Sequence, residues 1–182
     1  MNRTRGRKLQ LLSALVLILT LTLGGPLQAG SGDVAMLTPF KADRVVVLKG
    51  ERRLVLMRGD RVLKVYRVAL GRYPEGHKSR QGDAKTPEGS YTIDYRIDSD
   101  RSKFYRALHI SYPNERDRAR AAQLGVDPGG QIMIHGLPTN WSAKDVGHPK
   151  LDWTQGCIAL TNREMDEIWQ MVSDGTRIEI HP

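Results

Sequence analysis

Cysteine is almost absent from this sequence, and aromatic residues are scarce. Cys157 is the single cysteine among 182 residues, so the chain cannot form an internal disulfide. Aromatic residues make up only 6%, so a core must be built mainly from Val, Leu, Ile and Met. The length and the hydrophobic share of 40% suit one globular domain with one core, and exclude a scaffold held together by disulfides.

Acidic residues are missing from the N-terminal end. Four basic residues lie within the first eight positions, an apolar run occupies residues 9–27, and no acidic residue occurs before Asp33. This pattern predicts an export signal with Ala29 before the cleavage site. The run also approaches the roughly 20 residues that span a bilayer, so an uncleaved anchor is the alternative. We therefore predict a signal peptide or signal anchor at 1–29, a linker at 30–42, and export to the periplasm or cell envelope, with the membrane contacted only through the N-terminal segment.

The net charge of +8 belongs in part to this segment. Without it the chain holds 24 basic and 20 acidic residues, a net charge of +4. A mildly basic body suits an anionic polymer such as a cell wall, although a solvated surface explains the same charge. Because the remaining basic residues are interleaved with acidic ones, nucleic acid is not an expected partner.

Apolar, β-branched runs separated by turn residues dominate the rest of the chain. A Gly- and Pro-rich stretch at 71–89 is expected to be a long loop, and long ordered loops are often functional. Helices are expected at 114–124 and at 162–172, the second with Asn162 as N-cap. Strands are expected at residues 44–48, 53–57, 62–70, 91–97, 107–112, 131–135, 157–160 and 177–180. These elements predict a mostly-β domain with two short helices.

Two glycine-flanked side chains suggest chemistry. Cys157 directly follows Gly156, and His135 directly precedes Gly136 at the end of an apolar run. A glycine before a nucleophile allows a tight turn and a close approach of substrate. A thiol becomes a thiolate near neutral pH only beside a base or a cation, and His is suited to this role. The residues alone leave two interpretations open: a His–Cys catalytic pair, or a buried cysteine that packs as a small apolar side chain.

At these residues the sequence resembles the YkuD-type L,D-transpeptidase catalytic domain family. The family signature is a strand-borne His-Gly followed, after a variable stretch, by Ser/Thr-x-Gly-Cys; the chain has HG at 135–136 and TQGC at 154–157. The family's GD-x-x-TP-x-G segment resembles GDAKTPEG at 82–89. The resemblance covers residues 43–182, and implies a mostly-β catalytic fold, sandwich-like or barrel-like, with a few short helices.

The resemblance implies thiol catalysis that uses no metal or other cofactor. Cys157 is the expected nucleophile, and His135 the expected proton donor and acceptor. The carbonyl of Gly136 is expected to orient His135, with the Asp152 side chain as the alternative. The amide of Gly156, together with that of Cys157, is expected to face the developing oxyanion.

The same resemblance implies a substrate. An L,D-transpeptidase attacks a peptidoglycan stem peptide, forms a thioester and passes the acyl group to an amine of a neighbouring stem, so that the wall is cross-linked or remodelled. Wall-linked proteins are alternative acceptors. Transfer to water would instead make the chain an L,D-carboxypeptidase or endopeptidase. A non-catalytic wall-binding module is a third hypothesis.

Two positions depart from the family pattern. Gln155 stands where His or Lys is common, and Ala159 stands where an Arg is common. The contact to the substrate carboxylate is therefore expected either to be missing or to move, for instance to Arg163 or Arg80. The full set of expected substrate-binding residues is Thr154, Gln155, Trp141 and Arg80.

The separation between His135 and Cys157 implies an extended loop over the site, residues 137–151. His148 in this loop is either a second imidazole near the thiol or an exposed side chain. A zinc site built from these two histidines and the cysteine is not expected, because their spacing fits no structural zinc pattern.

Overall fold

The structure, a computed structural model, describes residues 40–182, so the predicted export segment lies outside the described residues. No helix in this range is long and apolar enough to cross a membrane. The α-helices are α1 (Glu115–Leu124) and α2 (Asn162–Met171), and a short 3-10 helix, η1, spans Ser99–Arg101. The strands are β1 (Ala42–Leu48), β2 (Arg53–Arg58), β3 (Arg61–Arg67), β4 (Gly89–Ile97), β5 (Ala107–Ile110), β6 (Met133–His135), β7 (Ile158–Ala159) and β8 (Val172–His181).

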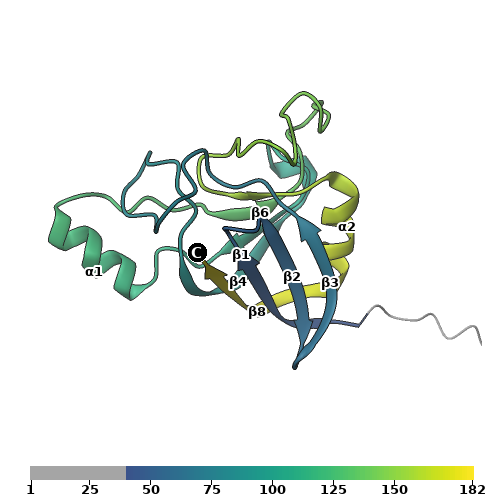
Figure 1. Ribbon diagram of the computed structural model, residues 1–182, viewed down its shortest axis with the longest axis horizontal. Helices are drawn as coiled ribbons and strands as arrows, with labels where there is room; N and C mark the ends of the chain where they lie inside the picture. Colours follow the sequence, from purple (N-terminus) through teal and green to yellow (C-terminus); the bar gives the residue numbers. More distant parts are fainter. Residues whose placement is uncertain (1–39) are drawn as a thin grey trace, which may run out of the picture. The chain divides into compact units, whose positions relative to one another are not determined.

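The strands form one sheet in the order β3-β2-β1-β8-β4-β5-β6-β7 (Figure 1). The first three strands make an antiparallel meander, and β8 joins it by pairing in parallel with β1. The sheet curls back on itself, because Ala69, two residues after β3, bridges Ala159 in β7. This confirms the predicted mostly-β, barrel-like class, and it brings the two ends of the sheet together beside Cys157.

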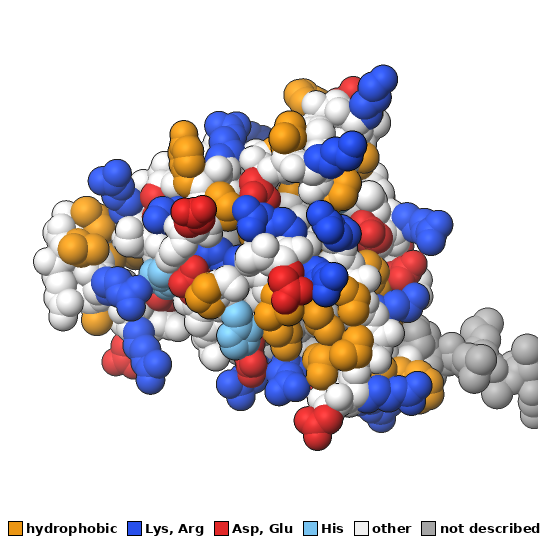
Figure 2. Space-filling model, in the orientation of Figure 1, with side chains coloured by type: hydrophobic (Ala, Val, Ile, Leu, Met, Phe, Trp, Pro, Cys, Tyr) orange, Lys and Arg blue, Asp and Glu red, His pale blue; other side chains and the backbone are white. Residues whose placement is uncertain are grey.

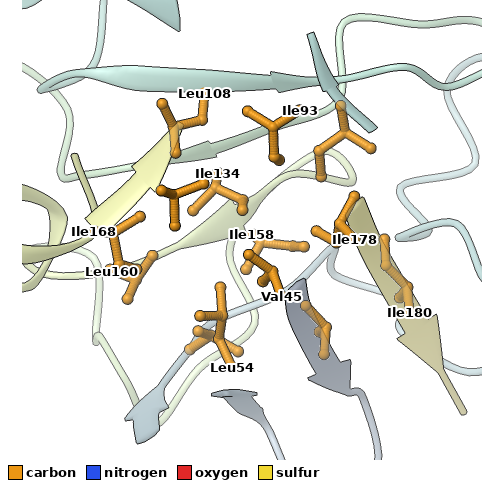
Figure 3. Close-up of a cluster of buried hydrophobic side chains, with 14 of the residues drawn as sticks. Val45, Leu54, Ile93, Leu108, Ile134, Ile158, Leu160, Ile168, Ile178 and Ile180 are labelled. Atoms are coloured by element: carbon orange, nitrogen blue, oxygen red, sulfur yellow. The ribbon is translucent and has the colours of Figure 1, made fainter. Parts of the chain in front are cut away.

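The core lies inside this curl. Period-2 alternation along the strands directs apolar side chains inward, as for Val45 and Val47 in β1 and Ile178 and Ile180 in β8. Helix α2 covers the core through Met165 and Ile168, spaced as one helical face requires. Figure 3 shows Ile168 among the buried hydrophobic side chains. Helix α1 is polar, and it projects from one end of the sheet (Figure 1).

One helix start differs from the prediction. Asn162 is the first residue of α2, and Thr161 is its N-cap, in a capping box with Glu164. The Asn162 side chain instead accepts a hydrogen bond from the Leu137 N–H at 2.9 Å. Thr161 is the better N-cap because its hydroxyl accepts a hydrogen bond from the Glu164 N–H, while the Glu164 carboxylate accepts one from the Thr161 N–H.

Several strand ends also differ from the prediction. The expected strand 62–70 ends at Arg67, and the expected strand 157–160 shortens to Ile158–Ala159, which leaves Cys157 outside regular structure. The last strand is longer than expected and begins at Val172, directly after α2. Strand β1 begins at Ala42, the last position of the predicted linker. Hydrophobic alternation does not show where hydrogen-bonded pairing stops.

Candidate active site

Cys157 lies at the end of a tight turn that leads into β7. Gly156 has a φ of +131°, a conformation that favours glycine. A Cβ at this position would lie 2.6 Å from the carbonyl oxygen of Lys85, so the long loop packs directly against the turn. Gly156 is therefore required both by its own backbone and by its neighbour.

Thr154 holds the turn from within. Its hydroxyl accepts a hydrogen bond from the Gly156 N–H at 3.0 Å and donates one to the Cys157 carbonyl at 2.7 Å. Its side chain is buried. The structure thus places Thr154 in the scaffold of the turn, whereas the sequence suggested a substrate contact.

His135 ends β6, on the strand next to β7, and is only 1% exposed. Its Nδ1 lies 2.6 Å from the carbonyl oxygen of Gly136, which identifies Nδ1 as the protonated nitrogen. Burial lowers the pKa of His135 to about 4. Its buried Nε2 has no hydrogen-bond partner among residues 40–182. The imidazole is therefore neutral near pH 7, and its Nε2 lone pair is free.

The register between β6 and β7 indicates which face of the sheet Cys157 shares. His135 pairs with Ala159, and Ile134 pairs with Ile158. The two isoleucines belong to the core, so His135 and Ala159 face the other side. Because side chains alternate along a strand, we infer that Cys157, two residues before Ala159, shares the face of His135.

Small side chains flank the histidine. Ala107 in β5 and Ala159 in β7 pair with it, Ala69 bridges Ala159, and all three alanines are fully buried. This leaves room above the sheet for the ring of Phe104, which stacks on the imidazole with centroids 3.9 Å apart. The Trp153 ring stands edge-on to the imidazole at 5.8 Å. Burial by these rings keeps His135 neutral.

The thiol of Cys157 is held beside backbone polar groups. Its Sγ lies 3.7 Å from the carbonyl oxygen of Gln131. Burial raises the pKa of Cys157, while a hydrogen bond from the Met133 N–H and the positive charge of Lys78 oppose this rise. At rest Cys157 is therefore a thiol and His135 a neutral imidazole. A thiol of this kind needs a base for its ionisation near neutral pH.

Only one of the two expected oxyanion amides is free. The Gly156 N–H is bonded to Thr154, as described above, whereas no hydrogen bond within residues 40–182 uses the Cys157 N–H. The Cys157 amide is thus the one that can bind a developing oxyanion.

Gly136 is fixed from both sides. Its N–H donates to the carbonyl of Tyr105 at 2.8 Å, and its own carbonyl faces His135. A Cβ on Gly136 would lie 2.8 Å from both the Tyr105 carbonyl oxygen and the Asn162 side chain. Asp152, the alternative partner for His135, instead binds the Arg52 guanidinium at 2.9 Å and the Leu70 N–H at 2.9 Å.

The remaining expected residues are spread around the site. Gln155 is exposed at the turn. Trp141 is exposed in the loop 137–151, and Arg163 projects from α2 with a side chain 92% exposed. His148 is buried, its Nδ1 has no hydrogen-bond partner among residues 40–182, and it lies near enough to disfavour the charged form of His135. Within those residues no three His, Cys, Asp or Glu side chains are arranged to hold a metal.

The long loop between β3 and β4 forms a wall of the site. Asp83 organises it by accepting hydrogen bonds from the N–H groups of Ser79, Arg80 and Lys85 and from the buried Lys78 ammonium. These contacts hold the pKa of Asp83 below its usual range. The sequence predicted the loop but not this ion pair, because Lys78 and Asp83 carry no signal that distinguishes them from surface charges. The contact of Phe104 with His135 was likewise missed, since no spacing links the two.

Comparison with known proteins identifies relatives along the described chain. A family model described as the L,D-transpeptidase catalytic domain (YkuD) matches residues 42–180. A relative named as an L,D-transpeptidase by assignment only, YafK of Escherichia coli (strain K12), is 30% identical to this chain over 177 residues. The alignment covers 92% of this chain and 64% of YafK, so the chain spans less than two thirds of that relative's length.

Solved structures show the same fold. The helical cell shape determining protein Pgp2 from Campylobacter jejuni superposes with a TM-score of 0.59 at 26% identity, over 76% of this chain and 46% of Pgp2. An L,D-transpeptidase from Xylanimonas cellulosilytica has a TM-score of 0.50 at 17% identity, over 78% of this chain and 61% of that one. The second likeness concerns the fold alone.

Proposed function

The chain belongs to the L,D-transpeptidase catalytic domain family, and from this premise we propose that it is an L,D-transpeptidase of peptidoglycan stem peptides. One observation carries the proposal. A neutral, buried His135 donates a hydrogen bond from its Nδ1–H to the Gly136 carbonyl, which leaves Nε2 as an acceptor on the sheet face that we assign to Cys157. A thiol nucleophile requires a base so disposed.

In the first half-reaction Cys157 is the nucleophile. Its Sγ forms a bond to the carbonyl carbon of the L,D peptide bond while the thiol proton passes to His135 Nε2. The oxyanion accepts a hydrogen bond from the Cys157 N–H. The C–N bond then breaks, His135 returns the proton to the departing amine, and D-alanine leaves behind a thioester on Cys157.

In the second half-reaction an amine of a neighbouring stem resolves the thioester. The amine nitrogen bonds to the acyl carbon and its proton passes to His135 Nε2. The C–S bond breaks, and the proton returns to Cys157. The products are a cross-linked stem and the free thiol. The proposal places this work in the periplasm or cell envelope, where peptidoglycan lies. Because Pgp2 is named as a determinant of helical cell shape, we extend the proposal to wall remodelling that affects shape.

Hydrolysis is the second candidate, and the environment of Ala159 favours it. Ala159 is fully buried between His135 and Ala69, so no cation stands where the family commonly has an Arg. A loosely held acceptor stem would leave the thioester open to water, and the enzyme would then act as an L,D-carboxypeptidase or endopeptidase.

Incubation of the purified protein with disaccharide-tetrapeptide tests the function. We expect D-alanine release together with cross-linked dimers in the mass spectrum; tripeptide alone would assign the hydrolytic alternative.

Substitution of the two proposed catalytic residues is a separate test. Cys157→Ser should abolish turnover, and His135→Ala should lower it by about 100- to 10,000-fold, the usual value of general-base assistance. Unchanged turnover in Cys157→Ser would refute the nucleophile, and a loss below about tenfold in His135→Ala would point to another base, for which His148→Ala is the matched variant.

A further inference from the structure

A groove of about 600 Å³ lies beside the long loop of the active site. Its lining includes Tyr73, Arg80, Asp83 and Lys85 from the loop and Leu124 from the end of α1. A volume of this size suits a peptide segment of a few residues. On the face shown in Figure 2, Lys and Arg side chains are spread over the surface, with Asp and Glu side chains between them.

The groove carries net positive charge. Its one carboxylate, Asp83, is already neutralised by the Lys78 ammonium at 2.8 Å and by three backbone N–H groups. Within residues 40–182 the side chains of Arg80 and Lys85 form no ion pair and no hydrogen bond, although both line the groove. Two uncommitted cations beside a neutralised carboxylate favour an anionic ligand.

The groove also has apolar walls. The residues Tyr73 and Leu124 are 68% and 59% exposed, and they come from different segments. Apolar walls beside cations fit a ligand that combines carboxylates with an aliphatic chain. A purely inorganic anion would leave both apolar side chains in water.

Both sides of the groove lead to the nucleophile. On the loop side, the Lys85 carbonyl packs against Gly156, the residue before Cys157. On the other side, the chain continues from Leu124 to Gln131, whose carbonyl oxygen lies 3.7 Å from the Cys157 Sγ. A hydrogen bond of 2.7 Å from the Gln81 N–H to the Asp127 carbonyl ties the two sides together.

We propose that this groove is the subsite for the carboxylate-bearing part of the stem peptide, with Arg80 and Lys85 as anion ligands and Tyr73 and Leu124 as apolar walls. This inference rests on the proposed function, and it relocates the carboxylate contact that Ala159 lacks. Arg80 and Lys85 are the paired ligands because both line the same cavity, whereas Arg163 is not among its lining residues.

Binding to a catalytically inert chain tests the subsite directly. In the Cys157→Ala background, Arg80→Glu combined with Lys85→Glu should weaken binding of disaccharide-tetrapeptide at least tenfold in calorimetry. When the carboxylates of the same compound are converted to carboxamides, it should bind equally well to the Cys157→Ala chain and to that chain carrying both glutamate substitutions. Arg61→Glu combined with Arg67→Glu makes the same charge change on the exposed edge strand β3, and it should alter affinity less than twofold. Equal losses in the two double variants, or equal losses for both ligands, would overturn the subsite.

Thiol alkylation supplies a readout that does not depend on turnover. Iodoacetate and iodoacetamide both alkylate a thiolate with loss of iodide, but only iodoacetate is an anion. In the chain with Cys157 intact, the Arg80→Glu and Lys85→Glu pair should lower the ratio of iodoacetate to iodoacetamide rates at least about threefold, because the local field acts on the charged reagent. An unchanged ratio would show that the groove does not lead to Cys157. If the chain binds the stem peptide through these cations but does not turn it over, the subsite proposal stands and the proposed function is refuted.

Discussion

At the scale of single residues, the turn before Cys157 shows how closely backbone and chemistry are joined. Gly156 has a backbone conformation that favours glycine, and Thr154 closes the turn with two hydrogen bonds. One of these bonds occupies the Gly156 N–H, so the neighbouring Cys157 N–H is left for an oxyanion. The position of a single hydroxyl thus decides which amide is available.

Replacing Gly156 by alanine should damage activity more than stability. The new Cβ would meet the Lys85 carbonyl oxygen at 2.6 Å, so the turn must shift and displace Cys157. A shift of about 1 Å at a reacting atom can cost about 100-fold in rate, and we expect a loss of that size in kcat/KM. Gly125→Ala is the matched control, because Gly125 also has a positive φ, +65°, but a Cβ added there would have no other atom within 4 Å. It should cost about 1 kcal/mol of stability and leave kcat/KM unchanged. Equal activity in the two variants would contradict the account.

At the scale of elements, buried charges fasten irregular segments to the sheet. The long loop is tied to the end of β1 by Lys49, the residue directly after that strand, whose ammonium donates to the carbonyls of Gly76 and Thr86 and to the Glu88 carboxylate. It is tied to α1 by His77, whose Nε2 lies 3.1 Å from an Asp117 carboxylate oxygen. A loop of this length can form the wall of a site because its polar anchors are buried.

Asp152 fastens the segment before the nucleophile turn, and its loss should be felt as stability. Asp152→Ala leaves the Leu70 N–H and the Arg52 guanidinium without their carboxylate partner. We expect a loss of about 2 kcal/mol in urea unfolding, as for other hydrogen bonds to a charged group. Glu51→Ala removes a pair with Arg53 in which both side chains are more than half exposed, and it should cost less than about 1 kcal/mol. A loss from Asp152→Ala no larger than that of the control would show that Asp152 does not hold the segment.

At the scale of the whole molecule, the curled sheet determines what is buried. Its closure between Ala69 and Ala159 puts β6 and β7 next to the end of the first hairpin. The face that carries His135 is thereby covered by Phe104, by Trp153 and by the loops, and not by the core. The His135 imidazole is consequently as deeply buried as a core residue.

This burial should make the fold sensitive to mild acid. The pKa of His135 is about 4 in the folded chain and about 6.5 when unfolded, so the unfolded state binds more protons between these values. Stability from this group is fully present above pH 6.5 and falls as the pH drops towards 4. Between pH 7 and pH 5 we expect a loss of about 2 kcal/mol in urea unfolding from His135 alone.

His135→Asn should flatten this dependence. Burial also lowers the pKa of His148, so His148 adds a smaller loss of the same sign. The pKa values of Asp83 and Asp117 lie below 3.8, so their contribution is lost only at lower pH. The same slope in the wild-type chain and in His135→Asn would show that His135 is not the group responsible.

The sequence alone was sufficient for the class of fold, and it predicted a site built on Cys157 and His135, which stays a prediction. Alternating β-branched runs predicted most of the strands, because period-2 burial is a local property of the chain. Cys157 and His135 were found from their glycine neighbours and from the family resemblance, since these motifs are contiguous. The structure agrees with the predicted position of His135 at the end of a strand, whereas Cys157, predicted as the first residue of a strand, directly precedes β7.

Only the tertiary structure decided how these residues are used. The pairing of β6 with β7 depends on long-range hydrogen bonds, so no local pattern could show that His135 lies in register with Ala159. Three further features depend on the folded path of the chain. They are the hydrogen bonds of Thr154 inside its turn, the contact of Asp152 with Arg52, and the stacking of Phe104 on His135. Burial and charge at a site depend on neighbours from distant segments of the chain. The neutral state of His135 and the cationic groove at Arg80 and Lys85 therefore follow from the fold and not from the motif.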